Sequence, residues 1–331
     1  MSHTSARTRS RNAPAGTSPF AVEGEALPTA KFSDPRVTAK GEPRAFVAPT
    51  RIETLWLNTG TLCNLACASC YIESSPTNDA LLYLSQAHAE RFMDEARGMA
   101  TREIGLTGGE PFMNPDILAI LSGALGRGFD VLVLTNAMKP MRRHETALLA
   151  LRDEAGERLT LRVSLDHHTP AVHEAERGPR SWDAAMDGLR WLSDNGFSLA
   201  VAGRLLPGES EGEARNAYAA LFAAEGIRVD ARDPARLVLF PEMDESKDIA
   251  EITTACWGIL GKRPEDIMCA TSRMVVHRKG EPAPRVVSCT LLPYAEGFDL
   301  GDTLAQSRED VALNHPHCAR FCVLGGASCS T

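Results

Sequence analysis

Three cysteines in one short run are the side chains of this 331-residue chain that are best suited to bind a metal cluster. Cys63, Cys67 and Cys70 follow the spacing CxxxCxxC. Iron–sulfur clusters are held by cysteine thiolates, and a 4Fe–4S cluster usually takes four of them. A compact set of three leaves the fourth iron open to a group that is not part of the protein. The spacing therefore predicts a cluster that acts as a reagent.

Zinc is the main alternative for these thiols. Zinc sites prefer paired CxxC half-sites and a closed tetrahedral shell. Three buried cysteines without a ligand would be unusual within eight residues, and a disulfide is a poor third choice. A second motif, Gly108-Gly109-Glu110-Pro111, follows one strand and one helix later. As a bare string this motif is also an ordinary turn, but its place after CxxxCxxC favours the cluster.

Short apolar runs alternate with helical patterns between residues 52 and 240 and position these motifs. Such alternation is typical of βα units around a parallel sheet. We expect N-caps at Asn114 and Ser181 for two of the intervening helices. The six predicted strands cover residues 52–57, 103–106, 131–135, 159–165, 197–202 and 236–240.

The two motifs together resemble the radical S-adenosylmethionine (radical SAM) superfamily, over about residues 51–331. The resemblance implies an α/β fold, a partial (βα)6 TIM-like barrel, with its site at the C-terminal strand ends. Cys63, Cys67 and Cys70 would ligate a 4Fe–4S cluster whose open iron is chelated by SAM. An electron, from a donor such as a flavodoxin or ferredoxin, would cleave SAM to methionine and a 5′-deoxyadenosyl radical that abstracts hydrogen from a substrate.

The same resemblance implies a set of residues that bind SAM. The GGE segment of the family receives the amino group of SAM, and Thr135-Asn136 resembles its TNG element, with Ala137 in place of glycine. Ser164-Leu165-Asp166 resembles its SLD element, although capping or turn roles explain such positions equally well. The implied cofactor-binding residues are Gly108, Gly109, Glu110, Pro111, Tyr71, Thr135, Asn136, Ser164, Asp166 and Arg204.

Three further positions near this set bear on SAM binding. The family usually has an aromatic residue just before the third cysteine, where this chain has Ser69, so Tyr71 is expected to take over stacking on adenine. Arg177, which follows the SLD-like element, adds to the resemblance. Arg204 is expected to pair with the carboxylate of SAM, and a surface salt bridge is the alternative.

The C-terminal part predicts a second cluster. Runs at 274–276 and 285–287 read as a hairpin, and the cysteines around it resemble the twitch extension or a trimmed SPASM domain, although the SPASM spacing CxxCxxxxxCxxxC is absent. Cys256 reads as a small buried residue. The expected ligands of a single auxiliary 4Fe–4S cluster are Cys269, Cys289, Cys318 and Cys322, with Cys329 as a substitute.

Length, composition and charge predict the domain bounds, the compartment and the class of partner. We expect a disordered or wrapping segment at 1–50, the radical SAM core at 51–245 and the auxiliary-cluster extension at 246–331. Nine cysteines without an export signal indicate a reducing, cytoplasmic compartment. No apolar run is long enough to cross a membrane. The net charge of −8 makes nucleic acid an improbable partner, since phosphate binding needs clustered Lys and Arg.

The sequence leaves the substrate and the catalytic acid or base open. A small metabolite, or a peptide delivered by a partner protein, is expected, because residues 1–50 are too short and aperiodic for a leader-binding domain. One alternative is an iron–sulfur sensor or scaffold that binds SAM without turnover. A nucleic-acid-modifying radical SAM enzyme is another, disfavoured by the acidic balance.

Overall fold

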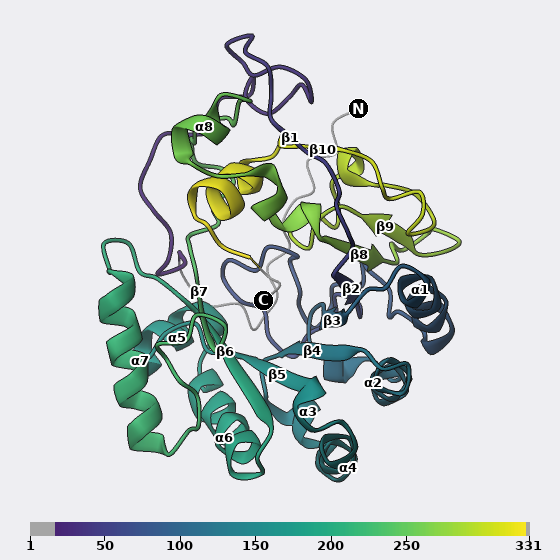
Figure 1. Ribbon diagram of the computed structural model, residues 1–331. Coiled ribbons are helices and arrows are strands. Elements are labelled where there is room, and N and C mark those ends of the chain that lie inside the picture. Colours follow the sequence, from purple (N-terminus) through teal and green to yellow (C-terminus); the bar gives the residue numbers. More distant parts are fainter. Residues whose placement is uncertain (1–16, 329–331) are drawn as a thin grey trace.

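The alternating pattern folds into strands and helices in turn, as a computed structural model of the protein shows for the described residues 17–328 (Figure 1). Six strands of this part are parallel and adjacent in chain order. They are β2 (Thr54–Asn58), β3 (Glu103–Thr107), β4 (Asp130–Thr135), β5 (Leu159–Ser164), β6 (Ser198–Arg204) and β7 (Leu237–Phe240). All six predicted strands are confirmed, with ends shifted by two residues at most.

Helices cover the outer face of this sheet, as Figure 1 shows for α1, α2, α4, α6 and α7. Buried apolar side chains recur every three or four residues in α2, at Ile117, Ile120, Leu121 and Ala124, and pack in the core between sheet and helices. The helices are α1 (Gln86–Gly98), α2 (Ile117–Gly126), α3 (Lys139–Arg142), α4 (Glu145–Ala155), α5 (Pro170–Arg177), α6 (Ser181–Asp194) and α7 (Glu211–Glu225).

The two predicted helix caps have different outcomes. Asn114 Oδ1 accepts from the Asp116 N–H at 2.8 Å, as a cap does, although the regular helix α2 begins only at Ile117. The Nδ2 of the same buried side chain donates to the carbonyls of Thr59 (3.0 Å) and Leu84 (2.9 Å). Ser181 lies inside α6, and its hydroxyl is buried without a partner among the described residues. Arg180, with a φ of +63°, occupies the position before that helix. The predicted cap at Ser181 is therefore wrong.

The predicted hairpin is confirmed, and it extends the main sheet. Strand β8 (Ser272–Val276) pairs parallel with β2, and β9 (Arg285–Val287) pairs antiparallel with β8. The order of the eight-stranded sheet is β7-β6-β5-β4-β3-β2-β8-β9, so β7 and β9 are edges. Among the described residues the sheet does not close, which confirms an α/β partial barrel.

Residues 17–50 run along the C-terminal part of the chain. Strand β1 (Phe46–Val47) pairs antiparallel with β10 (Val311–Ala312), and Figure 1 shows this purple segment beside the green and yellow part that contains α8 (Cys256–Leu260). Arg44 and Glu251 form a buried ion pair, with 2.6 Å between Nη2 and Oε1. A second apolar core, distinct from that under the helices, fills this region.

No helix of the described residues has the length and apolar character needed to cross a bilayer.

Candidate active site and auxiliary cysteine site

A cavity of about 180 Å³ opens at the C-terminal edge of the parallel sheet. The last residues of β3 to β7 line it, because parallel strands end at the same edge. Met243, Leu291 and Phe321, from the chain after β7, also line it. The predicted site residues that line it are Cys63, Cys67, Cys70, Tyr71, Gly108, Gly109, Thr135, Asn136, Ser164, Asp166 and Arg204.

The three cysteines lie on an irregular loop after β2, with their thiols toward this cavity. The Leu65 N–H donates to Cys63 Sγ and the Ser74 N–H to Cys70 Sγ, both at 3.4 Å. Burial raises the pKa of Cys63 to about 12 and also raises the pKa of Cys70. These thiols are therefore protonated until a metal displaces the proton, and hydrogen bonds to sulfur are typical of cluster ligands.

The spacing of these sulfurs bears on the zinc alternative. A single zinc ion with Zn–S bonds of about 2.3 Å would draw its sulfur ligands to within about 4 Å of one another. The groups of described residues whose ligand atoms all lie within 4.8 Å of one another contain no cysteine. The loop therefore fits a multi-iron cluster better than one zinc ion.

Gly108 and Gly109 are required by a close approach of two backbones. A Cβ at Gly109 would lie 2.3 Å from the carbonyl oxygen of Leu62, and one at Gly108 would lie 2.6 Å from that of Gly60. Gly108 also has a φ of +144°. The glycines thus let the end of β3 pack against the segment that leads into the cysteine loop, a reason that the motif alone does not reveal.

Glu110 is buried and does not line the cavity. Its carboxylate accepts hydrogen bonds from Thr135 Oγ1 (2.9 Å), the Asn136 N–H (2.8 Å) and the Phe112 N–H (3.2 Å). Burial raises the pKa of this carboxyl to about 7, although these three donors oppose the shift. These protein partners join the ends of β3 and β4, and an interaction of Glu110 with the SAM ammonium stays a prediction. Pro111 follows it into a short 3₁₀ turn, Pro111–Met113.

Asn136 connects this network to the cysteine loop. Its Nδ2 donates to Asn64 Oδ1 at 2.9 Å and lies 4.0 Å from Cys63 Sγ. Ala137, which stands where the family has glycine, has a φ of +57° and is fully buried. The left-handed backbone explains why glycine suits this position.

Two charged networks complete the cavity. Asp166 Oδ2 accepts from Arg177 Nε at 2.6 Å, and although burial favours a raised pKa, the charge of Arg177 holds the pKa of Asp166 below its ordinary value. Arg204 Nη1 donates to Ser69 Oγ at 2.6 Å, lies 3.4 Å from Glu176 Oε1 and stacks over Phe20 at 4.2 Å. Arg204 is thus partnered within the protein.

Glu176 is the residue that sequence reasoning missed. It is 2 % exposed, and its Oε1 accepts from both the backbone N–H (2.9 Å) and the hydroxyl (2.7 Å) of Ser69. Its carbonyl accepts from the Ala68 N–H. The carboxylate fastens the cysteine loop to α5, and this gives Ser69 a role that an aromatic residue could not fill. Tyr71, expected to stack on adenine, does line the cavity.

A second, smaller cavity lies in the C-terminal part and is lined by Cys269, Cys289, Cys318 and Cys322. Cys269 precedes β8 and Cys289 follows β9, so the antiparallel pairing brings them together. Cys318 and Cys322 share one turn of a π-helix (Cys318–Leu324), a rare form often found at functional sites. Cys329 lies outside the described residues. Cys256 lines neither cavity and accepts from the Thr253 N–H at 3.4 Å.

A buried arginine adjoins this second cysteine group. Arg273 is 1 % exposed, donates to the Cys269 carbonyl at 2.5 Å and has an Nη2 without a hydrogen-bond partner among the described residues. Burial lowers the pKa of Arg273, whereas Cys269 and Cys289 would raise it as thiolates. A buried cation of this kind fits an anionic cluster held by thiolates.

Comparison with known proteins decides the family. Residues 57–221 match the model of the radical SAM superfamily. The chain belongs to the radical SAM superfamily. This match confirms the family that the cysteine spacing and the GGEP motif predicted. The members of this superfamily are enzymes, and so is this protein.

Two curated relatives are similar to this chain over only part of their length. The antilisterial bacteriocin subtilosin biosynthesis protein AlbA of Bacillus subtilis is 34% identical over 141 residues, which are 42% of this chain and 30% of that protein. The mycofactocin maturase MftC of Mycobacterium tuberculosis is 30% identical over 136 residues, 41% of this chain and 33% of that protein. The matched segments therefore span about a third of these relatives.

Solved structures share the fold of this radical SAM protein. Streptococcus suis SuiB bound to the precursor peptide SuiA has a TM-score of 0.57 at 12% identity, covering 79% of this chain and 66% of that one. Native anSMEcpe with bound AdoMet has a TM-score of 0.55 at 13% identity, covering 79% of this chain and 81% of that one. At such identities the likeness shows the fold alone.

Proposed function

We propose that the protein cleaves SAM reductively at a 4Fe–4S cluster held by Cys63, Cys67 and Cys70. The observation that carries this proposal is the single cavity that gathers these thiols with the C-terminal ends of β3 to β7. When bound, the cluster and SAM supply the chemistry of a 5′-deoxyadenosyl radical that abstracts hydrogen from substrate. A small reductant such as a flavodoxin or ferredoxin would provide the electron.

The chain's own residues would hold and orient the cofactor. Gly108 and Gly109 present backbone to the cavity without side chains. Ser164 and Asp166, at the end of β5, offer hydrogen-bonding groups, and the pairing of Asp166 with Arg177 keeps that carboxylate ionised. Glu110 acts as a positioning residue, because its carboxylate fixes the backbone of Asn136 beside Cys63. The apolar side chains of the C-terminal part exclude water from a reactive radical.

We further propose one auxiliary 4Fe–4S cluster on Cys269, Cys289, Cys318 and Cys322. Their common cavity and the adjacent Arg273 support this assignment. Leu291, two residues after Cys289, lines both cavities. This proximity suits electron transfer between the two sites.

The substrate we propose is a peptide. The names of the two curated relatives concern the biosynthesis of the bacteriocin subtilosin and the maturation of mycofactocin. This favours the peptide over the small metabolite among the substrates expected from sequence.

Isotope transfer tests this function. Candidate precursor peptides, taken from the genes beside this one and deuterated throughout, are incubated anaerobically with the reduced, cluster-loaded protein and SAM. We expect 5′-deoxyadenosine that carries deuterium and a peptide of altered mass. Unlabelled 5′-deoxyadenosine with every peptide would contradict the peptide assignment, and no 5′-deoxyadenosine at all would favour a sensor or scaffold.

A further inference from the structure

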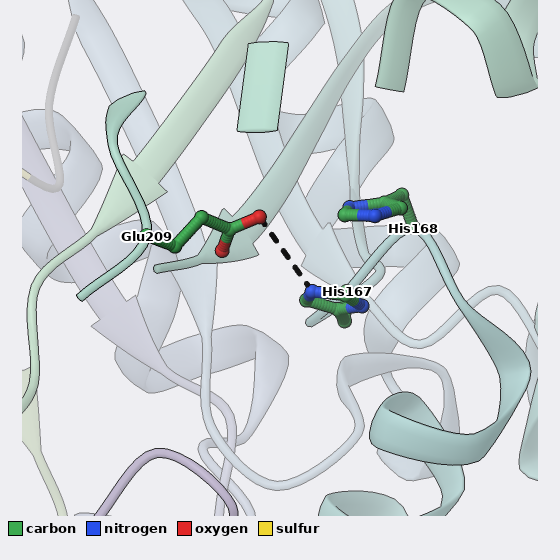
Figure 2. Close-up of side chains that lie close together, drawn as sticks. All are labelled: His167, His168 and Glu209. Carbon is green, nitrogen blue, oxygen red and sulfur yellow. Dashed lines mark ion pairs between the residues drawn. The ribbon is translucent and has the colours of Figure 1, made fainter. Parts of the chain in front are cut away.

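Two histidines and a glutamate converge at a place that neither cavity includes. His167 and His168 follow β5, and Glu209 lies between β6 and α7. Because β5 and β6 are adjacent and parallel, both loops leave the same edge of the sheet. One potential ligand atom from each residue lies within 4.8 Å of the other two. Figure 2 shows the carboxylate of Glu209 facing the ring of His167, with the ring of His168 alongside.

The polar atoms at this point lack partners. His167 is 4 % exposed, and neither its Nε2 nor His168 Nδ1 has a hydrogen-bond partner among the described residues. The gap of 3.8 Å between His167 Nε2 and Glu209 Oε1 is too long for a hydrogen bond. Buried nitrogens left in this way cost free energy unless another group satisfies them. The geometry thus leaves a place for a small ligand that accepts electron pairs.

We propose that His167, His168 and Glu209 bind one divalent first-row transition-metal ion, with Zn²⁺ as the probe. Two imidazoles and a carboxylate are ordinary zinc ligands, and three protein ligands leave a fourth position for water. The Leu206 N–H donates to Glu209 Oε2 at 3.0 Å, which holds the carboxylate and leaves Oε1 toward the histidines. The site contains no cysteine, so its donor set differs from those of the cluster sites.

Thr169 acts as a positioning residue for this ion. His167 Nδ1 lies 2.8 Å from Thr169 Oγ1 and accepts a hydrogen bond from the Thr169 backbone N–H at 3.1 Å. Metal binding at Nε2 requires the ring proton on Nδ1, so the ring would change tautomer and Nδ1 would donate to the Thr169 hydroxyl instead of accepting from the backbone N–H. A metal-bound histidine typically donates its other N–H in this way, and loss of the partner costs about 10–100-fold in affinity.

The bound ion would fasten two loops that also serve the cofactor cavity. Asp166 and Arg204 line that cavity and belong to the same two strand ends, where the Arg204 N–H donates to the Asp166 carbonyl at 2.9 Å. Zinc is therefore expected to raise the thermal unfolding temperature of the protein.

The test uses cluster-loaded protein incubated with Zn²⁺ and then desalted. We expect about one zinc per chain with only nitrogen and oxygen ligands at about 2.0–2.1 Å in the zinc-edge X-ray absorption spectrum. His168→Ala and Glu209→Gln should each lose most of this zinc, and Thr169→Val should bind it about 10–100-fold more weakly. Glu211→Gln, at the exposed start of α7, is the matched control and should retain it.

Iron measured in the same samples shows that each variant has kept its clusters and folded. Sulfur ligands at about 2.3 Å would place the zinc on cysteines and overturn the proposal. Equal zinc retention in Glu209→Gln and Glu211→Gln would do the same, as would a parent protein that keeps no zinc. These outcomes are independent of SAM cleavage, so they do not depend on the proposed function.

Discussion

Arg177 makes a two-point ion pair with Asp166 beside the cysteine loop. Arg177 Nε lies 2.6 Å from Asp166 Oδ2, and Nη2 lies 3.2 Å from Oδ1. Both side chains are largely buried, and both line the cavity. The pair therefore places one positive and one negative group at the cavity, and their charges cancel.

Removal of one partner should be costly. Asp166→Asn leaves the Arg177 guanidinium buried without its counter-ion, and we expect a loss of about 3–5 kcal/mol in the free energy of unfolding. Replacement of both residues by apolar ones should recover most of it. Denaturant unfolding measures both variants, with Arg263→Gln, which breaks an exposed pair with Asp266, as a control that should change little. A loss in Asp166→Asn no larger than in this control would contradict the account.

Glu110 should make stability depend on pH. Burial raises its folded pKa to about 7, above the ordinary 4.5, so the folded protein takes up this proton more readily than the unfolded chain. Stability therefore falls as pH rises toward 7, by about 2 kcal/mol between pH 5.5 and 8 relative to Glu110→Gln, which does not titrate.

Thermal unfolding at several pH values checks this difference. Glu213→Gln removes an exposed carboxyl whose pKa is held low by its hydrogen bonds with Ser210, and it should show no such change with pH. If the difference in stability between the parent and Glu110→Gln is the same at every pH from 5.5 to 8, Glu110 stays ionised throughout, which would contradict this prediction.

Gly109 should not tolerate a side chain. The Cβ of Gly109→Ala would lie 2.3 Å from the Leu62 carbonyl oxygen, so the cysteine loop must shift. We expect a loss of about 1–3 kcal/mol in stability and a reduced iron content. Gly126→Ala, at the end of α2, meets no atom within 4 Å and should keep full iron and stability. Full iron loading of Gly109→Ala would show that the close packing is not needed.

Two cysteine groups predict two clusters. Anaerobically reconstituted protein should carry about eight irons per chain, and Cys289→Ala combined with Cys318→Ala should reduce this to about four. Cys256→Ala, which lines neither cavity, should keep all of them. A parent protein with about four irons, unchanged by the double substitution, would remove the auxiliary cluster.

The sequence predicted what depends on local pattern. Strand positions followed from apolar runs, and the predicted hairpin brings Cys269 and Cys289 to one cavity. Contacts between distant residues had no local signal. Glu176 reaches Ser69 across 107 positions, and Phe20 meets Arg204 from the N-terminal segment. Glu110 belongs to a motif of the family, but its hydrogen-bond partners depend on how the ends of β3 and β4 meet.

The central claim is that Cys63, Cys67 and Cys70 support cleavage of SAM. The most direct measurement is 5′-deoxyadenosine formed by anaerobically reduced protein with SAM, for the parent, Cys67→Ser and Cys256→Ser. Serine keeps the size of the side chain but not the thiolate ligand. We predict that the parent and Cys256→Ser each form 5′-deoxyadenosine, with one methionine for each molecule formed. Cys67→Ser should form no 5′-deoxyadenosine while it keeps about four irons. A triple alanine variant of the three cysteines that still forms 5′-deoxyadenosine would contradict the account.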